Sequence, residues 1–329
     1  MNTARPPRET PPGKPLSAPL PTKDGVGPSC VALPPGPWGS IDEFLAERFA
    51  AIPADIWRAR MQRGELLDEH GAAVAPGQPY RAGGRLYYYR AIDDEPKVPF
   101  DEVLLFQDEL LVAVDKPHFL SVTPGGRHLH ETLLVRLKRR LGIDTLTPLH
   151  RLDRETAGVV VFSVQPATRG AYQALFAHKT VRKHYEAVAP WRPELAFPLT
   201  RRSRLVEDAH FLRMCEAPGE PNAETHFEVL ETLGSLGRYR LTPVTGRTHQ
   251  LRVHCAALGL PIAGDRMYPT LLPADTDDHA RPLQLLATTL AFTDPVTGQA
   301  RRFETARQLA TLRDTEALNE GAAALPARP

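Results

Sequence analysis

The stretch His150–Ser163 reads HRLDRETAGVVVFS and decides how this chain is interpreted. From Gly158 onward it is mostly apolar and β-branched, which is typical of a strand buried in a sheet. The charged residues before this strand therefore lie on a loop, where a rigid scaffold can hold Asp153 at a cleft. For an isolated Asp the commoner explanation is a turn cap or an ion pair with a neighbouring arginine. The other motifs of the chain have to decide between the two.

The composition sets broad limits on what the protein can be. With 329 residues, 42% of them hydrophobic, the chain can hold one large catalytic domain and a smaller unit. The net charge of +1 does not by itself indicate a nucleic-acid partner, although basic clusters at 136–140, 182–183 and 201–204 are compatible with RNA. The three cysteines form no Cys-x-x-Cys pair, so neither a disulfide framework nor a zinc site is supported. A polar, proline-rich N-terminus without a long apolar run predicts a cytoplasmic protein with no membrane segment.

Composition also divides the chain into four regions. The many prolines of residues 1–37 predict a disordered extension, because proline disfavours helices and strand pairing. Residues 38–95 are expected to form a small module, and residues 99–311 the main domain. Residues 312–329 are expected to be a flexible C-terminal tail.

The small module begins with two helical patterns. Ser40 is a plausible cap for the first helix, and the second helix, 54–63, carries Arg58, Arg60 and Arg63 on its exposed side. Short strands are expected afterwards, ending in the stretch 83–89. This order resembles the αL RNA-binding motif shared with a small-subunit ribosomal protein, although DEHG replaces the usual valine-asparagine-glycine turn. A plain accessory domain is the alternative.

The main domain alternates between strand and helix patterns. Helices are predicted at 132–141, 167–178 and 248–258, and strands at 104–106, 110–114, 158–164, 184–189, 225–230, 238–243 and 288–292. The fold class is therefore α+β, with a mixed, mostly antiparallel sheet and helices packed against it. No glycine-rich phosphate loop follows any of these strands, which argues against a Rossmann or P-loop domain.

Several segments of the main domain together resemble one family. In order they are DKP at 115–117, HRLDRETAGVVVF at 150–162, KHYEA at 183–187, TGRTHQLRVH at 245–254, LGLPIAGDRMY at 258–268 and DPVTG at 294–298. They are similar to the RluA-type pseudouridine synthases, which modify uridines in structured RNA. The resemblance covers about residues 100–305, and it implies the pseudouridine synthase fold. Small departures, such as Pro269 after Tyr268 where the family often has glycine, affect none of the residues assigned below.

The implied reaction breaks the N1–C1′ bond of a uridine, turns the uracil, and joins C5 to C1′. This isomerisation involves no redox change or hydrolysis, so no cofactor and no metal are expected. His249 and His254 are five residues apart and do not share a helix face, which also speaks against a metal site. The reaction does need a carboxylate that attacks covalently or removes a proton. The resemblance assigns that role to Asp153.

A catalytic carboxylate needs a cation nearby to stay charged. An unperturbed Asp ionises near pH ~4, and burial would favour the neutral acid unless a positive charge opposes it. The family pattern suggests an ion pair between Asp153 and Arg247. The alternative is that Arg247 binds phosphate at the start of the helix beginning near Thr248, where backbone N–H groups favour anions.

The remaining site residues are assigned as substrate contacts. The target base has to leave its stack, and the resemblance implies that Arg151 displaces it and fills its place. Tyr185 would lie against the uracil, and Leu251 would form an aliphatic wall. The alternatives are a core tyrosine with a satisfied hydroxyl and an ordinary core leucine. Thr248 is placed at the same site, and His150 is expected to orient the loop.

The sequence therefore predicts a monomeric RNA pseudouridine synthase that acts on 23S ribosomal RNA, with tRNA as the alternative substrate. A non-catalytic RNA-binding or folding factor is the alternative from another class. The combination of Asp153, Tyr185 and Arg247 favours the enzyme, because a binding protein has no evident use for all three. The uridine itself cannot be predicted, since recognition of folded RNA depends on shape and loop contacts.

Overall fold

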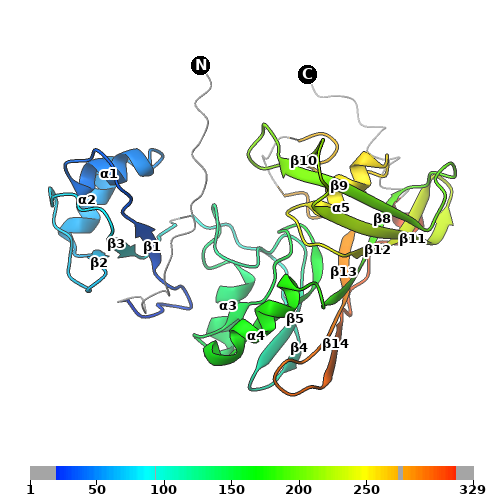
Figure 1. The fold of residues 1–329 in the computed structure, drawn as a ribbon, viewed down its shortest axis with the longest axis horizontal. Helices are drawn as coiled ribbons and strands as arrows, with labels where there is room; N and C mark the ends of the chain where they lie inside the picture. The colour runs from blue at the N-terminus through cyan, green and yellow to red at the C-terminus, as the bar shows by residue number, and fades with distance from the viewer. Residues whose placement is uncertain (1–19, 93, 273–276, 316–329) are drawn as a thin grey trace. The chain divides into compact units, whose positions relative to one another are not determined.

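A computed structural model describes residues 20–92, 94–272 and 277–315. Contacts divide the chain into two compact units, Met1–Asp93 and Asp94–Pro329. Each unit has its own hydrophobic core. Figure 1 labels most of the helices and strands of both.

The N-terminal unit packs two short helices against a small sheet. Its elements are β1 (Ser29–Ala32), α1 (Ile41–Arg48), α2 (Ala54–Gln62), β2 (Leu66–Asp68) and β3 (Arg85–Tyr88). The sheet is antiparallel, in the order β1-β3-β2. Ser40 caps α1 as predicted, because its Oγ accepts a hydrogen bond from the N–H of Glu43 at 3.3 Å.

The predicted disordered extension is wrong for its last part. All four residues of β1 pair with β3, and Leu33 is buried in the core of the unit. The prolines of this region flank the strand at Pro28 and Pro34, so the strand itself keeps its backbone donors, and proline is tolerated beside an edge strand. Residues 1–19 of the predicted extension lie outside the described residues.

The predicted exposure of the three arginines on the second helix is wrong for one of them. Arg58 and Arg63 are exposed as expected, but Arg60 is half-buried. Its guanidinium lies over the rings of Trp57 and Tyr88, at 5.5 and 5.6 Å from the ring centroids. Arg60 therefore stabilises the core of the unit through its cation–π contacts.

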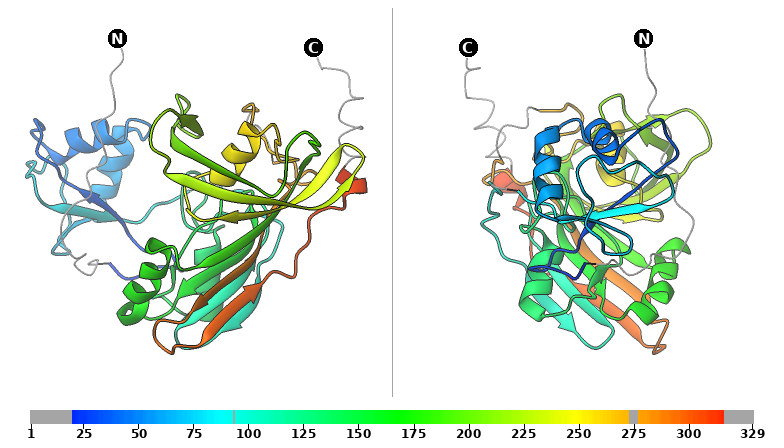
Figure 2. Two further views of the ribbon diagram at one scale, coloured as in Figure 1. Left: turned by 45° about the vertical axis from the view of Figure 1, so that its right-hand side comes forward. Right: turned by 90° about the vertical axis from the view of Figure 1, so that its left-hand side faces the viewer.

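The C-terminal unit is built on one mixed, eleven-stranded sheet. Its strands are β4 (Val103–Gln107), β5 (Leu111–Lys116), β6 (Thr147–Pro148), β7 (Ala157–Ser163), β8 (Arg182–Pro190), β9 (Leu199–Glu207), β10 (Met214–Ala217), β11 (Ala223–Leu233), β12 (Leu236–Pro243), β13 (Leu285–Thr293) and β14 (Ala300–Glu304). The main path runs β10-β9-β11-β12-β8-β13-β7-β5-β4, with β14 beside β13 and β6 beside β7. Among the described strands every pairing is antiparallel except that of β7 with β13, which confirms the predicted α+β class. Figure 2 shows the two halves of this sheet running in different directions from its middle.

Three helices cover the sheet: α3 (Leu133–Leu141), α4 (Pro166–Ala177) and α5 (Gln250–Ala257). Side chains alternate along β5 and β7, so one face packs against α3 and the other against α4. Helix α5 lies over the other half of the sheet, where Leu251 and Cys255 join a separate cluster. The two halves therefore have separate cores, and Tyr185 on β8 packs against both the α3 cluster and the α5 cluster.

Gly158 lies at the junction of the two halves. Its φ of +113° belongs to a region that other residues rarely adopt. A Cβ at this position would come within 2.1 Å of the Ala287 carbonyl oxygen. The parallel contact between β7 and β13 therefore requires glycine, and this contact fixes the start of β7 just after the loop that carries Asp153.

The predicted flexible C-terminal tail is wrong for residues 312–315, and residues 316–329 of that tail lie outside the described residues. Residues 312–315 form a helical turn, and Leu312 is buried beside Leu309, Val188 and Leu286. Burial of the apolar Leu312 side chain stabilises the folded state. The ordered chain therefore continues to residue 315, beyond the end that its composition predicts. No helix in the described ranges is long and apolar enough to cross a membrane.

Candidate active site

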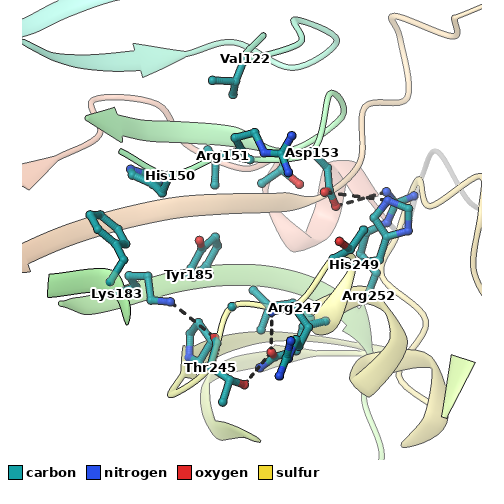
Figure 3. A pocket seen from close by; sticks show the side chains of 18 of the residues that line it. Val122, His150, Arg151, Asp153, Lys183, Tyr185, Thr245, Arg247, His249 and Arg252 are labelled. Atoms are coloured by element: carbon teal, nitrogen blue, oxygen red, sulfur yellow. Dashed lines mark hydrogen bonds and ion pairs between the residues drawn. The ribbon is translucent and has the colours of Figure 1, made fainter. Parts of the chain in front are cut away.

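A pocket of about 770 Å³ lies in the C-terminal unit, between the α3 and α5 clusters. Four segments supply most of its walls: the loop before β7, the start of β8, the turn between β12 and α5, and the first turn of α5. All the site residues predicted from the sequence line it: Asp153, Tyr185, Arg247, Arg151, His150, Leu251 and Thr248. Figure 3 shows Arg151 and Asp153 on one side and Tyr185 and Arg247 on the other.

The carboxylate of Asp153 is about one quarter exposed and faces two basic side chains. Its Oδ2 lies 3.5 Å from Nη1 of Arg252, and its Oδ1 lies 3.9 Å from Nε2 of His249 (Figure 3). The backbone of the loop is fixed as well, since the N–H of Thr156 donates to the Asp153 carbonyl at 3.1 Å. The loop therefore presents the carboxylate to the pocket.

The predicted ion pair between Asp153 and Arg247 is wrong. Arg247 is exposed at the pocket, and its Nε donates to the Asn222 carbonyl at 3.2 Å. The reason is the local backbone: α5 begins at Gln250, not near Thr248, and His249 before it has a left-handed φ of 52°. The chain direction changes between the two arginines of TGRTHQLR, so the second one, Arg252, points inward to Asp153.

Arg252 is held in place by a buried carboxylate. Its Nε and Nη2 donate to the two oxygens of Asp265 at 2.8 and 2.7 Å, and both side chains are at most 1% exposed. Burial opposes the charge on Arg252, but the hydrogen bonds with Asp265 and the charges of Asp153 and Glu155 outweigh it and raise its pKa. Its Nη1 is buried and has no hydrogen-bond partner among the described residues. This atom lies 3.5 Å from Oδ2 of Asp153 and 3.7 Å from Oε2 of Glu155, so it can serve either carboxylate.

Tyr185 and Lys183 reach the pocket from the same face of β8. Burial, together with the negative charge of Asp153, raises the pKa of Tyr185, so its hydroxyl stays protonated. That hydroxyl has no hydrogen-bond partner within the described ranges, which differs from the alternative of a satisfied core tyrosine. Lys183 donates to the Thr245 carbonyl at 3.4 Å, and burial lowers its pKa. Lys183 was not among the predicted site residues, although the Lys-x-Tyr spacing puts both residues on one strand face.

His150 is engaged by the protein itself. Its Nε2 accepts a hydrogen bond from the N–H of Val161 at 3.1 Å, and its ring stacks on Phe176 at 5.2 Å between centroids. Burial, with a further contribution from Lys183, lowers the pKa of His150 to about 3, so the ring is neutral. These contacts support an orienting role for the loop before β7.

The other predicted contacts differ in how far they are buried. Leu251 is 8% exposed and belongs to the α5 cluster, so it is both a core residue and part of the pocket wall. Arg151 and Thr248 are exposed at the pocket. In the part of the chain that the structure describes, the Arg151 side chain has neither a hydrogen bond nor an ion pair. No group of three or more His, Cys, Asp or Glu is placed to hold a metal ion among these residues.

Comparison with known proteins agrees with this architecture. A family model described as RNA pseudouridylate synthase matches residues 110–257. An uncharacterised RNA pseudouridine synthase of Synechocystis sp. is 31% identical over 229 residues, which are 69% of this chain and 78% of the relative. The dual-specificity RNA pseudouridine synthase RluA of Escherichia coli K12 is 32% identical over 206 residues, 61% of this chain and 91% of that protein.

Solved structures share the fold. Human RNA pseudouridylate synthase domain containing 1 superimposes with a TM-score of 0.52 at 22% identity, covering 72% of this chain and all of that one. Human RNA pseudouridylate synthase domain containing 4 gives a TM-score of 0.50 at 25% identity, covering 65% and 91%. The C-terminal unit thus has the pseudouridine synthase fold. The chain belongs to the RluA-type RNA pseudouridine synthase family and is an isomerase of RNA uridine.

Proposed function

We propose that Asp153 is the catalytic residue of this pocket and that the substrate is a uridine of 23S ribosomal RNA. The observation that carries the proposal is the pairing of Asp153 with Arg252. A buried arginine, neutralised on one side by Asp265, keeps one nitrogen directed at a carboxylate that faces an open pocket. A purely structural carboxylate has no need to face the pocket.

The isomerisation sets what the residues have to do. The N1–C1′ bond breaks, C5 bonds to C1′, the C5 proton leaves, and N1 takes a proton, so the atoms balance without a redox step. A charged Asp153 can act on the ribose or on the base, by covalent attack or by proton removal. Arg252 places a positive charge 3.5 Å from that carboxylate. Tyr185, with its protonated hydroxyl directed at the pocket, is proposed to contact the uracil.

The uridine has to leave its stack to reach Asp153. A pocket of about 770 Å³ falls within the ~300–1,000 Å³ range that is usual for small-molecule sites, so it has room for one extruded nucleoside. Arg151 is exposed at this pocket, and its side chain forms no hydrogen bond or ion pair within the described part of the protein. We propose that it fills the space the base leaves, while Leu251 forms an apolar wall of the pocket.

The exposed cations around the pocket support an RNA substrate. Arg247 and Lys179 are exposed there in addition to Arg151. Because Arg247 does not serve Asp153, phosphate binding is the role we propose for it. These contacts would supply affinity that is independent of sequence and weakened by salt.

The RNA class and the role of the N-terminal unit belong to the same proposal. The αL-like order of elements in the N-terminal unit, shared with a ribosomal protein, supports ribosomal RNA as the substrate. Transfer RNA stays the alternative substrate. A monomeric, cytoplasmic enzyme stays a prediction. A non-catalytic RNA-binding factor is disfavoured, because such a protein would have no use for the Asp153–Arg252 arrangement.

Mapping of pseudouridines in total RNA tests the proposal. The RNA would come from cells lacking the gene and complemented with the wild type or with Asp153→Asn. We expect one or more sites in 23S ribosomal RNA that only the wild type restores. Restoration by both proteins would refute the role of Asp153, and restored sites confined to tRNA would replace the proposed substrate with the alternative.

A further inference from the structure

His249 has an unusual backbone for a residue that is not glycine. Its φ of 52° and ψ of 15° are left-handed, at the residue that precedes α5. This conformation costs energy for a side chain with a Cβ, and such strain is found most often where function requires a fixed position. The side chain is only 12% exposed, and its ring is directed at Asp153 in Figure 3.

A chain of hydrogen bonds fixes which nitrogen of His249 carries the proton. The N–H of Met214 donates to the hydroxyl oxygen of Tyr268 at 2.8 Å. The hydroxyl oxygen of Tyr268 also lies 3.0 Å from Nδ1 of His249. Because the backbone N–H can only donate, the hydroxyl is free to donate its own proton to Nδ1. A neutral ring then carries its proton on Nε2, the atom that faces Asp153 Oδ1 at 3.9 Å.

The opposite tautomer is unfavourable for two reasons. It would leave the proton of Tyr268, a residue only 3% exposed, without the acceptor that His249 offers. It would also direct the lone pair of Nε2 at the carboxylate of Asp153. Both costs disappear when Nδ1 accepts and Nε2 donates.

Burial keeps this ring neutral. It lowers the pKa of His249, against the negative charges of Asp153, Glu155 and Asp265, while Arg252 adds to the lowering. Among the described residues, these four groups and Tyr268 are the titratable and charged side chains found to act on the ring. Around neutral pH, His249 is therefore a donor through Nε2 and not a second cation beside Arg252.

We propose that His249 is a positioning residue for Asp153, with Tyr268 fixing its tautomer. Nε2 of His249 holds Oδ1 while Nη1 of Arg252 holds Oδ2, so the plane of the carboxylate is set by two donors. The separations of 3.9 and 3.5 Å are longer than hydrogen bonds, and such contacts often shorten when substrate fills a site. This role rests on the proposed function, because it presupposes that Asp153 acts in the reaction.

Release of tritium from C5 measures the reaction directly, since the C5 proton is lost when C5 bonds to C1′. The probe is total RNA labelled with [5-³H]uridine, purified from cells that lack the gene. His249→Ala should lower kcat about 100-fold, as expected for a misplaced catalytic group, and leave KM within about 2-fold. His249→Gln is the matched control, because its side-chain amide can donate from nearly the position of Nε2. We expect it to recover most of the loss.

Tyr268→Phe supplies a readout that a merely structural role would not change. Losing the donor to Nδ1 removes a contact that favours the neutral ring, so the pKa of His249 should rise. A protonated His249 still donates through Nε2, but it is a second cation beside Arg252 and weakens Asp153 as a base or nucleophile. The fall of kcat at acid pH should therefore begin at a higher pH in Tyr268→Phe than in the wild type. An unchanged pH profile would contradict the role of Tyr268.

Two outcomes separate this inference from the proposed function. If Asp153→Asn is inactive but His249→Ala has the wild-type kcat, the positioning role is refuted and the catalytic Asp153 stands. If Asp153→Asn keeps full activity, the proposed function fails first. Equal losses in His249→Ala and His249→Gln, with unchanged thermal unfolding, would also refute the positioning role.

Discussion

The turn before α5 and the first turn of α5 contribute one arginine each to the same pocket. These two arginines differ in their exposure to solvent and in their hydrogen-bond partners. Arg247 on the turn is exposed and bonded to a backbone carbonyl. Arg252 on the helix is 1% exposed, bonded to Asp265 through two nitrogens, and directed at Asp153. We infer from this difference that the buried Arg252 positions the carboxylate of Asp153, whereas the exposed Arg247 can bind the substrate.

The largest expected effect is that of removing Arg252 on the free energy of unfolding. Arg252→Met leaves Asp265 as an unpaired, fully buried carboxylate, which should destabilise the protein by about 3–5 kcal/mol. Chemical denaturation of the purified variant measures this change. The double variant Arg252→Met/Asp265→Leu removes both charges and should recover most of the stability without recovering activity. No recovery of stability would mean that the pair is not the reason for the loss.

Arg151 is expected to show the next largest effect, and on rate more than on binding. If Arg151 fills the space that the base leaves, its side chain offsets part of the free-energy cost of unstacking the base, which is a few kcal/mol. Arg151→Ala loses this contribution, and we expect kcat to fall about 10- to 100-fold. Tritium release gives the rate, and filter binding of the same RNA gives the affinity. Equal losses in both measurements would contradict the base-displacing role.

Arg247 should affect binding and its salt dependence. As a phosphate contact, it should contribute about one unit to the slope of log affinity against log salt concentration. Arg247→Gln is therefore expected to bind RNA more weakly and with a slope about one unit shallower. A slope identical to that of the wild type would show that Arg247 makes no phosphate contact.

The smallest effect is expected in the N-terminal unit. Arg58 forms an ion pair with Asp42 at 3.5 Å and is 62% exposed, so water screens the interaction. Arg58→Gln should change the free energy of unfolding by less than about 1 kcal/mol in a denaturant titration. A change as large as that of Arg252→Met would mean that exposure does not separate the two kinds of arginine.

Much of the fold could be predicted because its periodic patterns are local. The α+β class, the buried strand after Asp153 and the basic helix at 132–141 follow from hydrophobic spacing. Strand β1 was missed because the many prolines around it predicted disorder for the whole region, although the strand itself contains none. The turn at 312–315 was missed because a buried Leu312 depends on contacts from distant strands.

The residues that line the pocket could be predicted from the sequence, but the arginine that pairs with Asp153 could not. TGRTHQLR offers two arginines, and which one points inward depends on the left-handed backbone of His249. One signal was present: Asp265, in a segment already noted, is a carboxylate among apolar residues that needs a buried cation. The sequence does not reveal that Arg252 is this cation, because the bond joins two segments through space.

The most direct test of the account compares kcat for Arg252→Lys and Arg247→Lys in the tritium-release assay at saturating RNA. Both variants keep the positive charge, but lysine cannot hold Asp265 and reach Asp153 at once. We expect Arg252→Lys to lose about 100-fold in kcat and Arg247→Lys to stay within about 3-fold of the wild type. The reverse order would contradict the claim that Arg252, not Arg247, serves the catalytic aspartate.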